Sequence, residues 1–140
     1  MHRFTSRALF VLCSSAVMAA CGGETPALPT PSPGPPPTIT EVFSGDINRN
    51  GGVTHPFLAE ASGNIVATLD GLEPEAVASI GVSLGTWNGS ACQVVIANDT
   101  AVAGATIVGT ASIASNLCLR VYDTGTIATL ASYQVTVVHP

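Results

Sequence analysis

The sequence predicts an all-β domain over residues 39–140, either a sandwich or a barrel. Apolar residues make up 46% of the chain but aromatic residues only 5%, so the apolar content is mainly Val, Ile, Leu and Ala among Thr, Ser and Gly. These residues suit the pleated surface of strands, whereas the helix-favouring Glu, Lys, Gln and Arg are scarce. Short β-rich runs that alternate with turn signals indicate the same class.

Eight such runs make up the domain, and several of them are apolar at every second position. This period predicts one buried and one solvated face. Asx-Gly steps at Asn50-Gly51 and Asn88-Gly89 supply the positive φ that tight turns need. The predicted strands are 39–46, 54–60, 64–71, 77–84, 92–98, 105–113, 117–123 and 131–138. The predicted inward sets are Ile65, Ala67 and Leu69; Ile80, Val82 and Leu84; Leu117, Leu119 and Val121; and Tyr133, Val135 and Val137.

Residues 1–20 have the layout of a secretory signal peptide. Arg3 and Arg7 precede an apolar run over 8–20, and that run is shorter than the roughly 20 residues of a membrane-spanning helix. The ending Met18-Ala19-Ala20-Cys21 resembles the bacterial lipobox, with Met18 where an aliphatic residue is usual. The resemblance implies cleavage before Cys21 and lipidation of its sulfur. The alternative is ordinary cleavage after Ala20, which leaves a free thiol.

Residues 21–38 are expected to be a lipidated cysteine and a proline-rich linker. Seven of the ten prolines lie within 24–38, where they prevent helix and ladder formation and favour an extended spacer. Fifteen residues at roughly 3.1 Å each reach about 45 Å. A PxxP ligand for a partner domain is the alternative. Gly22, rather than Asp, follows the cysteine, and by resemblance to lipoproteins of bacteria with two membranes this permits outer-membrane delivery.

The charge balance excludes two classes of partner. Beyond the signal peptide only Arg49 and Arg120 stand against nine acidic residues, and the chain contains no lysine. Such a body cannot neutralise phosphates, so nucleic acid is not expected as a partner. A polybasic membrane patch is equally absent, which leaves the lipid at Cys21 as the expected membrane contact.

Two cysteines, Cys92 and Cys118, remain after export and lipidation. In an exported domain they are expected to form a disulfide. No metal site is expected, because there is no CxxC motif and the domain has only two histidines, His55 and His139.

Several ordered segments resemble the bacterial pre-peptidase C-terminal domain family. They are Phe43-Ser44-Gly45, Gly52-Val53-Thr54-His55-Pro56-Phe57, Gly63-Asn64-Ile65-Val66-Ala67-Thr68-Leu69, Leu117-Cys118-Leu119-Arg120-Val121-Tyr122-Asp123 and Ser132-Tyr133-Gln134-Val135-Thr136-Val137. The resemblance implies a jelly-roll-like antiparallel β-sandwich of about eight strands. Family members usually follow secreted peptidases, and some relatives bind calcium or matrix polymers. Here no peptidase precedes the domain, and the acids Asp46, Asp70, Asp99 and Asp123 lack the Asp-x-Asp spacing of a calcium loop.

One catalytic pattern is present. Gly81-Val82-Ser83-Leu84-Gly85 matches the G-x-S-x-G of serine hydrolases, and Asp99 or Asp123 and then His139 follow in the hydrolase order. That serine must sit on a strand-to-helix turn, whereas Ser83 falls inside a predicted strand. We therefore expect no catalytic residue and no cofactor. His55 is expected to be a surface or strand-packing residue and His139 a mobile one.

The expected function is that of a non-catalytic envelope lipoprotein carrying a binding or interaction module. Trp87, the only tryptophan, is predicted in a turn, where it either contacts a polysaccharide or envelope protein or caps the core. The alternative is an accessory subunit of an envelope complex, which predicts a contiguous apolar surface patch. A hydrolase would need an exposed Ser83 within hydrogen-bond reach of His139.

Overall fold

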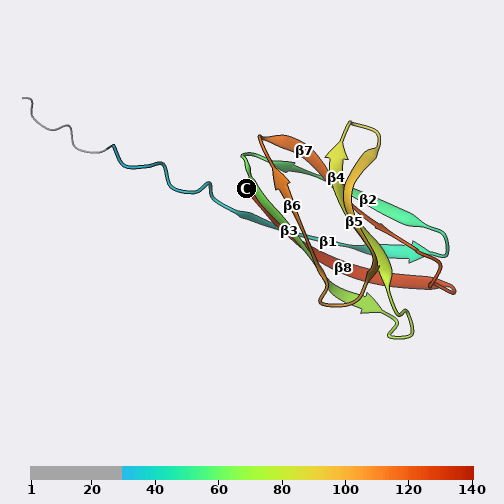
Figure 1. The fold of residues 1–140 in the computed structure, drawn as a ribbon. Helices are drawn as coiled ribbons and strands as arrows, with labels where there is room; N and C mark the ends of the chain where they lie inside the picture. Colours follow the sequence, from blue (N-terminus) through green and yellow to red (C-terminus); the bar gives the residue numbers. More distant parts are fainter. Residues whose placement is uncertain (1–29) are drawn as a thin grey trace, which may run out of the picture. The chain divides into compact units, whose positions relative to one another are not determined.

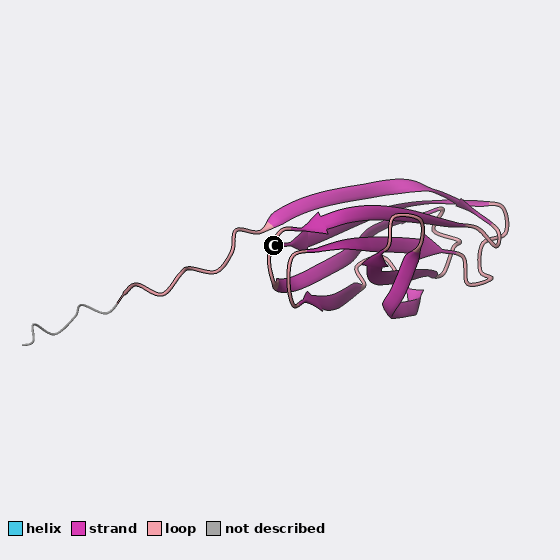
Figure 2. Cartoon of the chain, turned by 90° about the horizontal axis from the view of Figure 1, so that it is seen from above, coloured by secondary structure: helices cyan, strands magenta, loops and turns pink. Residues whose placement is uncertain are grey.

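Eight antiparallel strands in two four-stranded sheets form the domain (Figure 1). The computed structural model describes residues 30–140, and Gly34–Pro140 make up one compact unit. This part contains strands and loops but no helix (Figure 2), and hence no helix able to span a membrane. The strands are β1 (Ile39–Asn48), β2 (Gly52–Ala59), β3 (Gly63–Glu73), β4 (Ile80–Trp87), β5 (Cys92–Ala101), β6 (Thr106–Ala111), β7 (Ser115–Tyr122) and β8 (Leu130–His139).

The strand order is that of a jelly roll. One sheet runs β1-β8-β3-β6 and the other β2-β7-β4-β5. The first strand therefore pairs with the last, the second with the seventh, the third with the sixth and the fourth with the fifth, as in a long hairpin folded into two layers. The predicted fold class, an all-β antiparallel sandwich of eight strands, is confirmed.

Alternation along the strands builds the core between the sheets. All four predicted inward sets are buried, and in β8 Val135 and Val137 have no exposed surface. At roughly 25 cal/mol per Å² of apolar surface, this burial is the main stabilising contribution. Further buried residues from the strands and loops complete the core: Ile47, Phe57, Ala59, Val77, Ala101, Ile107, Ala111, Ile127 and Ala131.

The fourth strand differs most from its prediction. It begins at Ile80 rather than residue 77, because the N–H of Val77 donates to the carbonyl of Pro74 in a turn (2.8 Å). It also continues through Trp87, so the prediction that Trp87 lies in a turn is wrong. The turn starts at Asn88, whose Oδ1 accepts the N–H groups of Ser90 and Ala91 at 3.0 and 2.8 Å.

Each sheet has two edge strands, and the sandwich therefore has two open sides. The strand orders place β1 and β2 along one side and β6 and β5 along the other. We call these the β1–β2 side and the β5–β6 side. Histidines and aromatic rings lie along the β1–β2 side. Six of the ten exposed large apolar residues in the described chain lie on β5, on β6 or in the loops that flank β6, whereas Ile39, Val42 and Leu58 lie on β1 and β2.

Candidate functional site

The G-x-S-x-G pentapeptide is a packing pattern on the outer face of β4. Gly81, Ser83 and Gly85 face away from the core, where side-chain or backbone atoms of the neighbouring strands cover them. A Cβ atom on Gly81 would overlap the ring of Tyr122, and one on Gly85 would overlap the backbone carbonyl of Gln93. Ser83, between them, is 0% exposed, and its Oγ donates to the carbonyl of Arg120 at 3.4 Å. Small residues are required here because β4 is covered on both faces.

The residues in hydrolase order do not come together. Ser83 lies on β4, whereas His139 ends β8 in the other sheet and bonds to Glu41. Asp99 accepts a hydrogen bond from the Tyr122 hydroxyl. Asp123 accepts from the N–H groups of the turn that follows it. A hydrolase would need an exposed Ser83 within hydrogen-bond reach of His139. In the structure Ser83 is buried and His139 lies in the other sheet.

The predicted Cys92–Cys118 disulfide is present on this outer face. Its Cα atoms are 5.8 Å apart, and it joins β5 to β7 although β4 runs between them. The bond can cross β4 because Gly85, which pairs with Cys118, has no side chain. The backbone of β5 at Gln93 therefore packs directly against Gly85. The disulfide therefore depends on Gly85.

Trp87 lies next to the disulfide at the end of β4. It pairs with Cys92, is partly buried and is not part of the core cluster. The interpretation of Trp87 as a core cap is therefore wrong, because it stands on the outer face with Gly85 rather than between the sheets.

The β1–β2 side holds both histidines of the domain among aromatic rings. His55 stacks on Phe43 with ring centroids 5.0 Å apart, and its Nε2 lies 2.6 Å from the hydroxyl of Tyr133. Burial lowers the pKa of His55, and burial together with nearby Asp46 raises the pKa of Tyr133 to about 12. The pair is therefore neutral around pH 7, and His55 is the strand-packing residue that was expected.

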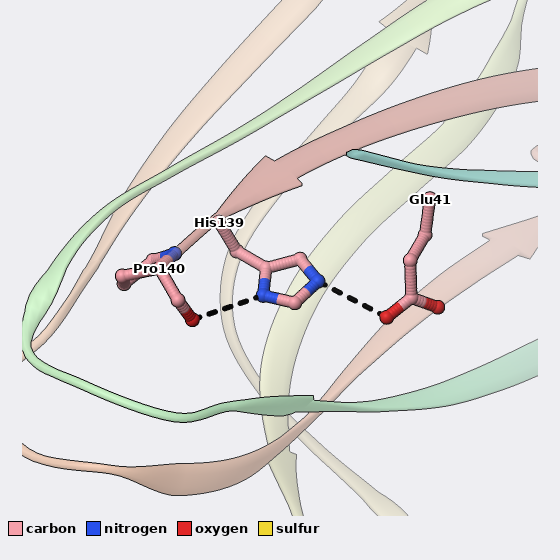
Figure 3. Close-up of polar contacts among 3 residues, drawn as sticks. All are labelled: Glu41, His139 and Pro140. Carbon is pink, nitrogen blue, oxygen red and sulfur yellow. Dashed lines mark hydrogen bonds and ion pairs between the residues drawn. The ribbon is translucent and has the colours of Figure 1, made fainter. Parts of the chain in front are cut away.

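His139 is the opposite of the predicted mobile residue. It is 0% exposed, packs 5.0 Å from the ring of Phe57, and lies between two oxygens (Figure 3). Its Nε2 is 3.1 Å from Oε1 of Glu41, and its Nδ1 is 3.2 Å from the carbonyl of Pro140. The prediction is wrong because β8 is paired with β1 along its whole length, up to the Ile39–His139 pair.

We expect His55 to make stability depend on pH. Its folded-state pKa lies below the unfolded value of about 6.5, so the neutral ring is the form that the fold favours. Above about pH 6.5 the His55 ring is neutral in both the folded and the unfolded protein, and its contribution to the free energy of unfolding is fully present. As the pH falls below that value the unfolded state takes up the proton first, and stability declines until the folded state is protonated too.

Urea unfolding of the wild type and of His55→Gln between pH 8 and pH 5 would measure this effect. Glutamine keeps a polar partner for Tyr133 but does not titrate, so the variant should lose less stability on acidification. Equal slopes for the two proteins would contradict the assignment.

The acidic residues bind separate partners rather than a common centre. Asp46 accepts from Ser132 and Asp70 from Thr136, both at 2.6 Å. A hydrogen bond from the N–H of Asn50 is the largest cause that lowers the pKa of Asp123. Within residues 30–140, no three His, Cys, Asp or Glu side chains are grouped so as to hold a metal ion.

The β5–β6 side is the feature that the predictions missed. Residues 76–119, which include both of its strands, contain one charged residue, Asp99. A small apolar groove opens between the sheets there. The groove is lined by Phe57, Ile65, Leu84, Gly85, Thr86, Val95, Ile96, Gly109, Thr110 and Leu117. Six exposed large apolar residues lie on these two strands or in the loops that flank β6, and two of them, Val95 and Ile96, also line the groove; the six are Val94, Val95, Ile96, Val102, Val108 and Ile113.

A sequence signal for this surface exists in the run Val94-Val95-Ile96. Three consecutive apolar residues break the alternation expected of a half-buried strand, and such exposed runs usually have a functional reason. The structure shows the cause: Leu84 pairs with Ile96 and Gly85 with Val94, so that Val95 is left over in a β-bulge.

The fold and the disulfide define the class of protein, a disulfide-bonded jelly-roll β-sandwich. The chain matches no protein-family model and no curated protein. Cys21 and the predicted signal peptide over residues 1–20 lie outside the described residues, and residues 30–38 have no regular secondary structure and are exposed.

Proposed function

We propose that this chain is a non-catalytic envelope lipoprotein whose β-sandwich docks onto a protein surface through its β5–β6 side. The observation that carries the proposal is the apolar groove, which the exposed residues Val95 and Ile96 border, within a stretch (76–119) that has a single charged residue. Large exposed apolar patches on a folded domain are typical of interaction sites. The resemblance of Met18-Ala19-Ala20-Cys21 to a lipobox and the proline-rich 24–38 segment support a membrane anchor with a spacer.

The lining of the groove favours a protein partner over a polysaccharide. Sugars are held by exposed aromatic rings together with converging polar groups. Here the only aromatic lining residue is Phe57, which is buried, and the only hydroxyls are those of Thr86 and Thr110. A contiguous apolar patch is the feature expected of an accessory subunit of an envelope complex. Trp87 is the candidate contact for the polysaccharide alternative.

Site-specific photo-crosslinking in cells tests the docking surface. A photoreactive residue in place of Val95, which is 77% exposed, should give a discrete crosslinked product. The same residue in place of Leu130, which is 47% exposed and lies away from this side, is the matched control. The identified partner should then bind the purified protein, and Val95→Glu should weaken binding by roughly tenfold or more.

Two results would contradict the proposal. Equal crosslinking from both positions would indicate random collision, and binding of a polysaccharide that is lost in Trp87→Ala would favour the other ligand class.

The anchor is tested in the same preparation by intact mass after detergent extraction. A mass that begins at Cys21 and includes acyl chains supports the lipoprotein, whereas an unlipidated mass removes the membrane from the proposal.

A further inference from the structure

The β5–β6 side has both a projection and a recess. Val95 is the most exposed large apolar residue in the part of the chain that the structure describes, and the bulge leaves it without a partner on β4. The groove lies immediately beside it, since Val95 and Ile96 form part of its wall. A surface with an adjacent projection and recess can be complementary to itself about a twofold axis.

The distribution of charge allows two copies to meet on this side. The described residues carry an excess of acids, so that two copies repel each other over most of their surface. Within residues 30–140 the acids are Glu41, Asp46, Glu60, Asp70, Glu73, Glu75, Asp99 and Asp123, and the only strong bases are Arg49 and Arg120. Within 76–119 the single acid, Asp99, is already hydrogen-bonded to Tyr122. An approach through the β5–β6 side therefore brings almost no like charges together.

We infer that the protein docked on the β5–β6 side is a second copy of this chain. In the twofold arrangement Val95 of each copy enters the groove of the other, near Thr110. Side-chain packing makes the contact rather than strand addition, because two register shifts along β5 interrupt its free edge. This inference rests on the proposed function and names the partner.

The expected anchor would strengthen the association. Two chains held at one membrane by linkers of about 45 Å share a small volume, which raises their effective concentration above that in solution. A contact too weak for a stable dimer in dilute solution would then be populated at the membrane. The linker also leaves each domain free to turn its β5–β6 side toward the other.

Disulfide trapping between two differently tagged full-length chains in the same membranes tests the inference. One chain carries Val95→Cys and the other Thr110→Cys, and mild oxidation should yield a mixed dimer. Replacing the first substitution by Leu130→Cys gives the control, with a yield lower by roughly tenfold. Each variant should retain the Cys92–Cys118 bond, as judged by mass before and after reduction.

Equal yields from the Val95→Cys and Leu130→Cys chains, or no mixed dimer in variants that keep the native disulfide, would overturn the inference. The same experiments test the proposed docking surface separately from the second-copy inference. If Val95 crosslinks to a different protein while no mixed dimer forms, the second-copy inference is wrong and the docking surface stands. If neither product forms, both fail.

Discussion

Gly85→Ala is expected to lower the free energy of unfolding by about 3 kcal/mol, near the upper end of the usual range for overpacking. The added methyl would overlap the backbone carbonyl of Gln93 rather than the end of a flexible side chain. The start of β5 would have to move away from β4, and that movement would strain the disulfide that crosses at this point. Urea unfolding followed by Trp87 fluorescence measures the change.

Gly71→Ala is the matched control for this substitution. Gly71 also lies in a strand, but the nearest atom to an added Cβ is 4.0 Å away, on the side chain of Gln134. The methyl fits there, and the smaller entropy of the unfolded chain should leave stability unchanged or slightly higher. If Gly85→Ala were as stable as Gly71→Ala, the close approach of β5 to β4 would not be a constraint on the sequence.

Removal of the Cys92–Cys118 bond is expected to cost about 3.5 kcal/mol in the chain-entropy model, for a closed loop of about 27 residues. A domain of roughly 100 residues has only about 5–15 kcal/mol in total, so the loss is a large share. The double variant Cys92→Ala with Cys118→Ala should unfold at a much lower urea concentration. Alanine avoids placing an unpaired hydroxyl at Cys118, which is fully buried.

Reductant distinguishes the bond from other effects of the substitutions. The wild type should become about as unstable as the double variant when it is reduced, whereas the double variant should not respond. An unchanged urea midpoint for the reduced wild type would show that the bond constrains a part of the chain that does not limit unfolding.

Local patterns were enough to predict the strands and most of their buried faces. Two kinds of pattern depend only on neighbouring residues and match the structure. They are the alternation of apolar residues over 65–69 and 133–137 and the turn at Asn88-Gly89. The prediction was wrong at the start of β4. Val77 is buried, as a strand residue would be, but it lies in the turn that follows Pro74. An apolar residue in a turn and one in a strand look alike in sequence.

The candidate site could not be predicted in the same way, because it depends on strand order. The sequence shows that Val95 breaks an alternation, but only the pairing of β5 with β4 shows that this strand is an edge and that Val95 bulges from it. His139 illustrates the same limit: its burial follows from the pairing of β8 with β1, about 100 residues earlier in the chain.

The sequence by itself determined the all-β class, the eight strands, the Cys92–Cys118 pair and the expectation of an exported, anchored chain, since composition, period and motifs are local properties. Only the tertiary structure decided what covers Gly81, Ser83 and Gly85, where the histidines lie and which apolar residues stay exposed. Those features arise where strands distant in sequence become neighbours. Side-chain periodicity specifies a strand's two faces but not the strands that lie beside it.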